Sequence, residues 1–126
     1  WEAAPVVRGT LIEARLGINL PKNFPVIDKL ENMVATSIKS IDVTAKTYLD
    51  AAKFGNKIRS YIDRLAAFKN ANWAGVRVRY GVNYFRKTLE LAVRKGKLTK
   101  AQKEVLDRLK QYAKEHNVKL DTKDVK

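Results

Sequence analysis

The chain contains no cysteine and a single histidine, and each shortage excludes a class of chemistry. Without cysteine the protein has no disulfide, no zinc finger and no thiol nucleophile. A ribonuclease site built on two histidines is also excluded, because His116 has no second histidine to work with. Long apolar runs are missing too, since none approaches the ~18 residues that span a bilayer. We therefore expect a domain without stable membrane association, whose chemistry depends on other side chains.

Acidic residues are scarce as well: 13 Asp and Glu stand against 26 Lys and Arg, for a net charge of +13. Such an excess attracts polyanions and speeds their encounter with the protein. The basic residues are spread along the chain rather than gathered in a tail, which suits a face or cleft built by the fold. This pattern favours nucleic-acid contact. The alternatives are a ribosomal-type basic surface and attraction to anionic lipid.

The 126 residues suit one domain, 1–126, with a single core. Because the sequence begins at Trp1 and shows no secretory leader pattern, we interpret it as the C-terminal piece of a larger protein. Apolar periodicity predicts helices at about 7–16, 48–69 and 99–117, and strands at 24–27, 33–43, 76–80, 84–93 and 118–125. The expected fold class is α/β (α+β), a mixed central sheet with flanking helices.

Two local patterns refine these elements. Thr99 and Gln102 have the spacing of a capping box at the start of the last helix. Residues 70–75 read as a turn, and residues 81–83 as the bend of a hairpin covering 76–93. Such a hairpin would offer edges for strand addition to a partner protein.

The segment from Asp28 to Lys39 carries the clearest chemical pattern. Asp28 is predicted to end one strand, and Ser37 and Lys39 share a face of the next, because strand side chains alternate. Glu13, on the first helix, would supply a second carboxylate. Carboxylates hold a hard divalent cation, and a lysine beside it steadies charge growing on phosphorus, so these residue types suit phosphodiester hydrolysis. The structural alternatives are a solvated strand lysine, a turn-capping aspartate and an exposed helix glutamate.

At these residues the chain resembles the PD-(D/E)xK, or restriction-endonuclease-like, superfamily. It departs from the pattern in having Ile27 before the acid, where proline is usual, and Ser37 where the family usually has a second acid. A closer likeness is to the nuclease toxin domains at the C-terminal ends of contact-dependent growth inhibition (CdiA-type) proteins. Residues 34–42, 89–93 and 98–102 look like theirs.

This resemblance implies a metal-dependent endonuclease toxin. Glu13 and Asp28 would hold a divalent ion (Zn, Mg or Mn), Ser37 would assist through a water or the metal, and Lys39 would activate the nucleophile or stabilise the transition state. The toxin would be secreted or delivered from the cell surface, act in the cytoplasm of the target bacterium, and be neutralised by an acidic immunity protein. We expect DNA as its substrate. The alternatives are a tRNA-cleaving toxin of the same fold, a metal-independent RNase toxin, and a non-catalytic basic module that binds nucleic acid.

Basic and aromatic residues alternate later in the chain. Arg77, Arg79, Arg86 and Lys87 flank Tyr80, Tyr84 and Phe85, a composition that clamps and stacks nucleic acid. The same aromatics would equally serve as core residues on alternating strands.

Overall fold

The structure, a computed structural model, describes residues 18–126, so the predicted first helix and Glu13 lie outside the described residues. Its elements are β1 (Lys29–Glu31), β2 (Val34–Ile41), α2 (Lys46–Leu49), α3 (Ala51–Ala67), β3 (Asn70–Trp73), β4 (Val76–Arg79), β5 (Arg86–Arg94), α4 (Lys100–Glu115) and β6 (Val118–Val125). None of the described helices is long and apolar enough to cross a membrane.

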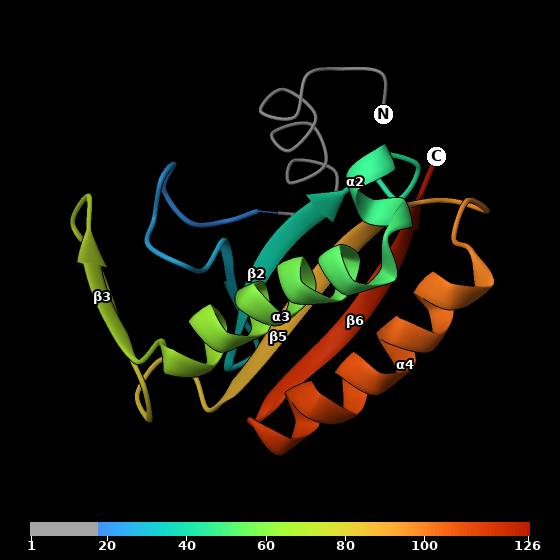
Figure 1. Ribbon diagram of the computed structural model, residues 1–126. Helices are drawn as coiled ribbons and strands as arrows, with labels where there is room; N and C mark the ends of the chain where they lie inside the picture. The colour runs from blue at the N-terminus through green and yellow to red at the C-terminus, as the bar shows by residue number, and fades with distance from the viewer. Residues whose placement is uncertain (1–17) are drawn as a thin grey trace.

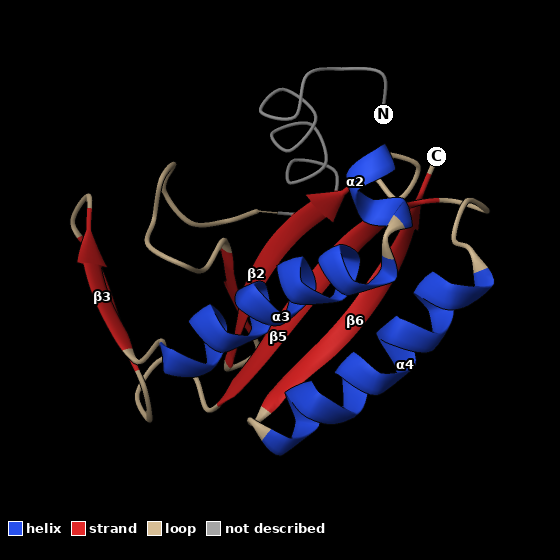
Figure 2. Cartoon of the chain, viewed as in Figure 1, coloured by secondary structure: helices blue, strands red, loops and turns tan. Residues whose placement is uncertain are grey.

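The main sheet has the strand order β1-β2-β5-β6. β1 is antiparallel to β2, whereas β2, β5 and β6 run parallel to one another. Parallel neighbours need a crossover, and α3 and α4 provide two of them on the same face of the sheet (Figures 1 and 2). The expected mixed sheet with flanking helices is confirmed.

The core lies between this sheet and the two helices. α3 contributes the stripe predicted from its periodicity, and β5 contributes apolar side chains that meet it. The main buried residues are Phe54, Ile58, Ile62 and Leu65 of α3, Val105, Leu106 and Leu109 of α4, and Leu89, Leu91 and Val93 of β5. The β2 side chains that point toward α3 therefore lie against a close-packed layer.

The start of α4 is fixed by the capping box that the sequence predicts. Thr99 Oγ1 accepts the Gln102 N–H at 3.1 Å, and Gln102 Oε1 accepts the Thr99 N–H at 2.9 Å. The fully buried Gln102 also donates from Nε2 to the carbonyls of Val43 and Tyr48, both at 2.8 Å. One side chain thus caps α4 and ties it to the connection that follows β2.

The predicted strand at 24–27 is wrong. This segment is a loop in which Asn23 and Val26 have positive φ angles of 62° and 64°, which break the extended conformation. Phe24 and Ile27 are buried as anchors of the loop rather than as strand residues. Consequently Asp28 precedes β1 instead of ending a strand.

The predicted hairpin over 76–93 and the turn at 70–75 are also wrong. The hairpin is β3 with β4, closed at Ala74 and Gly75, whose φ angles are 52° and 81°. β5 instead pairs in parallel with β2 and β6. Buried Leu91, Ala92 and Val93 form a continuous apolar run, as strands covered on both faces do, and this places β5 at the centre of the main sheet.

The long predicted helix is interrupted at Asp50. The Asp50 carboxylate caps α3 by accepting the N–H groups of Ala52 at 2.9 Å and Lys53 at 3.2 Å. The chain before it forms the short α2 instead of continuing α3.

Candidate active site

Asp28 lies where β1 stops pairing with β2. β1 covers β2 only from Val34 to Thr36 in the described structure, so the next backbone groups of β2 are on an edge. The N–H of Asp28 donates to the Thr36 carbonyl at 2.8 Å, and its Oδ2 accepts the Ile38 N–H at 2.7 Å. The Asp28 carboxylate thus occupies the position beside β2 that a longer β1 would fill. It is hydrogen-bonded to Ile38, the residue between Ser37 and Lys39.

Burial raises the pKa of the Asp28 carboxyl above its ordinary value of 3.8. The hydrogen bond from Ile38 and the positive charge of Lys39 oppose this rise without cancelling it. The loss of solvation therefore dominates, and a cation bound beside the carboxylate would favour its ionised form.

Ser37 and Lys39 share the face of β2 that looks toward α3, as strand alternation predicts. Ser37 is only 3% exposed, and Lys39 is half-buried. The Lys39 Nζ lies 5.6 Å from the centroid of the Tyr61 ring on α3, and the Lys57 Nζ lies 5.3 Å from the same centroid. The ring attracts both ammonium groups and positions the Lys39 amine near Asp28.

On the opposite face of the sheet lies an ion pair that the sequence interpretation missed. Lys29 Nζ is 3.3 Å from Glu90 Oε1, and both side chains are largely buried. Because Ile38 is the β2 residue level with Glu90, the pair crosses β2 and ties the start of β1 to β5. It also holds the residue next to Asp28. A glutamate inside the apolar run 89–93 was the available signal, because buried strand glutamates need a partner.

The donor set of the described residues fits part of a metal site. Asp28 offers carboxylate oxygen and Ser37 offers a hydroxyl, and such hard oxygen donors suit Mg²⁺ or Mn²⁺, while carboxylate also binds Zn²⁺. Between residues 18 and 126, no three His, Cys, Asp or Glu side chains gather closely enough to hold an ion. The second carboxylate predicted for the site, Glu13, lies outside this range.

The four predicted nucleic-acid-binding residues lie on two different sheets. Arg77 and Arg79 are exposed on β4, whereas Arg86 and Lys87 begin β5 in the main sheet. The Lys87 Nζ donates to the Ala66 carbonyl at 2.8 Å. The four basic residues therefore do not form one row along a single pair of strands, as the predicted hairpin would require.

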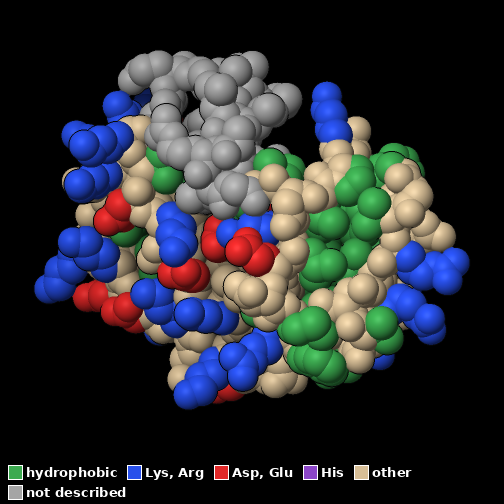
Figure 3. All heavy atoms as spheres, turned by 180° about the vertical axis from the view of Figure 1, so that it is seen from behind, with side chains coloured by type: hydrophobic (Ala, Val, Ile, Leu, Met, Phe, Trp, Pro, Cys, Tyr) green, Lys and Arg blue, Asp and Glu red, His purple; other side chains and the backbone are tan. Residues whose placement is uncertain are grey.

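The aromatic residues divide in the same way. Tyr84 is a core residue whose hydroxyl donates to the Lys69 carbonyl at 2.6 Å, which confirms one of the two interpretations for it. Tyr80 and Phe85 remain 57% and 58% exposed, so both rings are accessible to a ligand. Seen from behind, the surface carries many Lys and Arg side chains, especially on the side where β6 runs (Figure 3).

A mixed sheet with helices on one face, and an aspartate held against a Ser-x-Lys strand, defines a restriction-endonuclease-like domain. The family model described as "CDI toxin restriction endonuclease-like domain" matches residues 8–123, and the chain belongs to this family. CDI stands for contact-dependent growth inhibition, so the family predicted from residues 34–42 is confirmed.

One solved structure carries this likeness further. It is the "CdiA-CT/CdiI toxin and immunity complex from Yersinia pseudotuberculosis", with 29% sequence identity and a TM-score of 0.76. The match covers 90% of this chain and 98% of that chain. A search among curated proteins found no match.

Proposed function

We propose that the domain is a metal-dependent endonuclease that hydrolyses phosphodiester bonds, with DNA as the favoured substrate. The observation that carries the proposal is the Asp28 carboxylate, buried and bonded to the N–H between Ser37 and Lys39. A carboxylate and an amine fixed on adjacent positions of a rigid sheet are what such hydrolysis requires.

The residues have distinct roles in this proposal. Asp28 and Glu13 would hold a divalent ion, whose charge would polarise the phosphoryl group and lower the pKa of a water. Lys39, steadied by the Tyr61 ring, orients the attacking water or stabilises the negative charge on the phosphoryl oxygens. Ser37, whose side chain is buried, would assist through a water or the metal.

DNA is favoured over tRNA because this chain resembles toxin domains with Ser-x-Lys in place of Glu-x-Lys, and that resemblance implies metal-dependent cleavage of DNA. The fold does not decide between the two polymers, since phosphate contacts are common to both. A tRNA-cleaving toxin of the same fold is the second candidate, supported by the exposed rings of Tyr80 and Phe85, which suit unpaired bases.

The proposed partner is an acidic immunity protein, which protects the producing cell from its own toxin. The solved relative is a complex of toxin and immunity protein, and the net charge of +13 favours an acidic inhibitor. The free edges of the hairpin formed by β3 and β4 are suited to strand addition. Delivery from the surface of one bacterium and action in the cytoplasm of its neighbour complete the proposal.

The first test is cleavage of plasmid DNA and of total tRNA, with Mg²⁺, Mn²⁺ or Zn²⁺ and with excess chelator. We expect metal-dependent cleavage of plasmid by the wild-type domain and none by Asp28→Ala or Lys39→Ala. Lys57→Ala is the matched control, because the exposed Lys57 contacts the same Tyr61 ring but is not among the charges that shift the pKa of Asp28. It should retain most of the activity.

Circular dichroism melts separate a lost site from a lost fold. Both inactive variants should unfold cooperatively, since Asp28 and Lys39 lie at the margin of the core. If a variant loses its thermal transition as well as its activity, the substituted residue, Asp28 or Lys39, has a structural role. Cleavage that persists in chelator would favour the metal-independent RNase class, and binding without cleavage would favour the non-catalytic module.

A further inference from the structure

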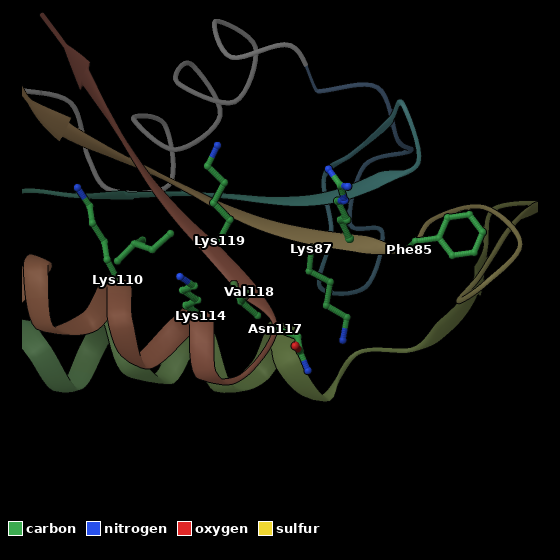
Figure 4. A pocket seen from close by; sticks show the side chains of 9 residues that line it. Phe85, Lys87, Lys110, Lys114, Asn117, Val118 and Lys119 are labelled. Atoms are coloured by element: carbon green, nitrogen blue, oxygen red, sulfur yellow. The ribbon is translucent and has the colours of Figure 1, made fainter.

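A second concave surface lies away from the candidate active site, at the other edge of the sheet. A groove of about 680 Å³ runs between α4 and the first residues of β5 and β6. A neighbouring hollow of about 460 Å³ shares Phe85, Lys87 and Asn117 with it, so the two form one depression, which we call the basic groove. Lys110 and Lys114 extend into it from α4 (Figure 4).

The lining of the basic groove carries charge of one sign. Its cations are Lys69, Arg86, Lys87, Lys110, Lys114 and Lys119, and no Asp or Glu among residues 18–126 lines either hollow. Within the part of the chain that the structure describes, none of these cations forms an ion pair. Cations gathered without counterions repel one another, and an anionic ligand removes that repulsion.

Lys87 is the cation most firmly fixed in the groove. Its Nζ donates to the Ala66 carbonyl near the C-terminal end of α3 at 2.8 Å. Burial, together with the like charge of Lys69, lowers the pKa of Lys87 below its ordinary value of 10.5. A phosphate oxygen in the groove would favour its charged form and form a charge-assisted hydrogen bond with it.

Two exposed aromatic rings belong to the same surface. Phe85 stands at the end of the groove beyond Lys87 (Figure 4). Tyr80 lines the neighbouring hollow, and its ring packs edge-on against Tyr84 at 5.5 Å between centroids. Rings beside a row of cations form a platform on which unpaired bases stack while their phosphates meet the lysines.

From these observations we infer that the basic groove binds an unpaired segment of nucleic acid, with its phosphates against Lys110 and Lys114 and a base stacked on Phe85. A double helix is stiff over about 150 base pairs and meets only the rim of a concave groove. An unpaired strand bends into it. The inference rests on the proposed function only in taking nucleic acid as the substrate, because binding here needs neither the metal nor Asp28.

The groove is near enough to serve the same substrate molecule as the candidate active site. Ser37, Leu89 and Leu120 lie level with one another on β2, β5 and β6, and Leu120 lines the groove. Two strand spacings separate Ser37 from Leu120, which is about 10 Å. Because buried Leu89 fills this direct line, a strand that serves both sites follows the surface of the domain and spans several nucleotides.

The test measures binding in chelator, where proposed metal-dependent cleavage is absent. Fluorescence anisotropy gives the Kd of labelled oligo-dT and oligo-U of about twelve nucleotides, and of a duplex of equal length. We expect tighter binding of the single strands. Lys110→Ala with Lys114→Ala should reduce the slope of log K against log salt by about 1.4, since each phosphate contact on a single strand contributes about 0.7.

A matched pair on the same helix controls for charge. Lys100→Ala with Lys103→Ala removes the same two charges from exposed positions of α4 outside the groove, and should leave the slope close to that of the wild type. Phe85→Ala should weaken single-strand binding roughly 5- to 100-fold, and Phe85→Trp should restore it. A preference for dT or for U identifies the polymer, and either supports the inference.

Three results would overturn the inference. One is an equal loss of affinity in both lysine pairs, which would mean a diffuse attraction instead of a site. Another is tighter binding of the duplex with no effect of Phe85→Ala. The third is unchanged oligonucleotide affinity accompanied by weaker binding of an immunity protein, which would assign the groove to that partner. Cleavage of plasmid with metal is measured separately. A failure of the basic groove to bind nucleic acid is therefore distinguishable from a failure of the nuclease proposal.

Discussion

At the scale of single residues, Asp28 is held by forces that oppose each other. The Ile38 N–H and Lys39 stabilise its charged form, but the larger effect is burial, which raises its pKa above 3.8. Above that raised pKa the folded protein carries a poorly solvated charge, whereas the unfolded chain carries a fully solvated one. Asp28 therefore lowers the free energy of unfolding at neutral pH, a common property of functional carboxylates.

A first prediction concerns the loss of stability caused by the buried charge of Asp28. In chelator at pH 7, Asp28→Asn should melt at a higher temperature than the wild type, because the amide keeps an acceptor for Ile38 without the buried charge. The gain should shrink as the pH falls through the pKa of Asp28 and vanish below 3.8, where the carboxyl is protonated in both states. Asp107→Asn, at an exposed position on α4, is the control and should show no comparable gain. A gain that grows as the pH falls would contradict the argument.

The sequence predicted those features of the site that depend on neighbouring residues, and not those that depend on residues far apart in the chain. Ser37 and Lys39 share a face because of strand alternation, a local property visible in the sequence. The bond from Ile38 to Asp28 follows a loop in which Val26 has a positive φ, a conformation that no propensity rule anticipates. The ring of Tyr61 reaches Lys39 only after α3 packs on the sheet.

At the scale of elements, Gln102 joins the start of α4 to the connection that follows β2. The prediction is a contrast between two residues of one capping box. Thr99→Ala should lower the free energy of unfolding by about 1 kcal/mol, the usual value of a lost N-cap. Gln102→Ala should lower it by about 2 kcal/mol or more, because the buried carbonyls of Val43 and Tyr48 also lose their donor.

Urea titrations measure both effects. Gln111→Ala is the control on the same helix, since Gln111 is exposed and bonds only to Glu115 at 3.4 Å among the described residues; its cost should be within about 0.5 kcal/mol of zero. Equal costs for Gln102→Ala and Gln111→Ala would show that the buried hydrogen bonds contribute nothing. Complete loss of cleavage in Thr99→Ala at unchanged stability would instead make Thr99 a site residue.

Elements with strong local patterns were predictable, and those set by tertiary pairing were not. The capping box and apolar stripe predicted α4, and alternation predicted β6 over its full length, Val118–Val125. β3 was missed because Asn70–Trp73 has polar, weakly strand-forming residues whose pairing comes from β4. β5 was assigned to a hairpin because a parallel partner distant in sequence leaves no turn to mark it.

At the scale of the whole molecule, the sheet separates two kinds of positive surface. Lys39 is near a buried carboxylate at the β2 edge, whereas the basic groove at the β6 edge has cations alone. The groove is therefore suited to hold an anion, and the β2 edge to act on one. In the proposed function, the excess of charge that attracts nucleic acid also attracts an acidic protein, so substrate and inhibitor would compete in one electrostatic field.

The last prediction follows from this competition. The acidic immunity protein proposed above would have to bind the domain before nucleic acid does, and long-range attraction to a +13 domain would accelerate that encounter. In stopped-flow experiments the association rate should fall about tenfold or more as salt rises from about 50 to about 500 mM, while the dissociation rate changes little.

Arg77→Ala with Arg79→Ala on the hairpin should slow association more than Lys100→Ala with Lys103→Ala, which removes equal charge elsewhere, if the β3–β4 edge is where the partner docks. A basic partner, or an association rate indifferent to salt, would contradict electrostatic capture, and equal effects of the two pairs would remove the hairpin from the interface.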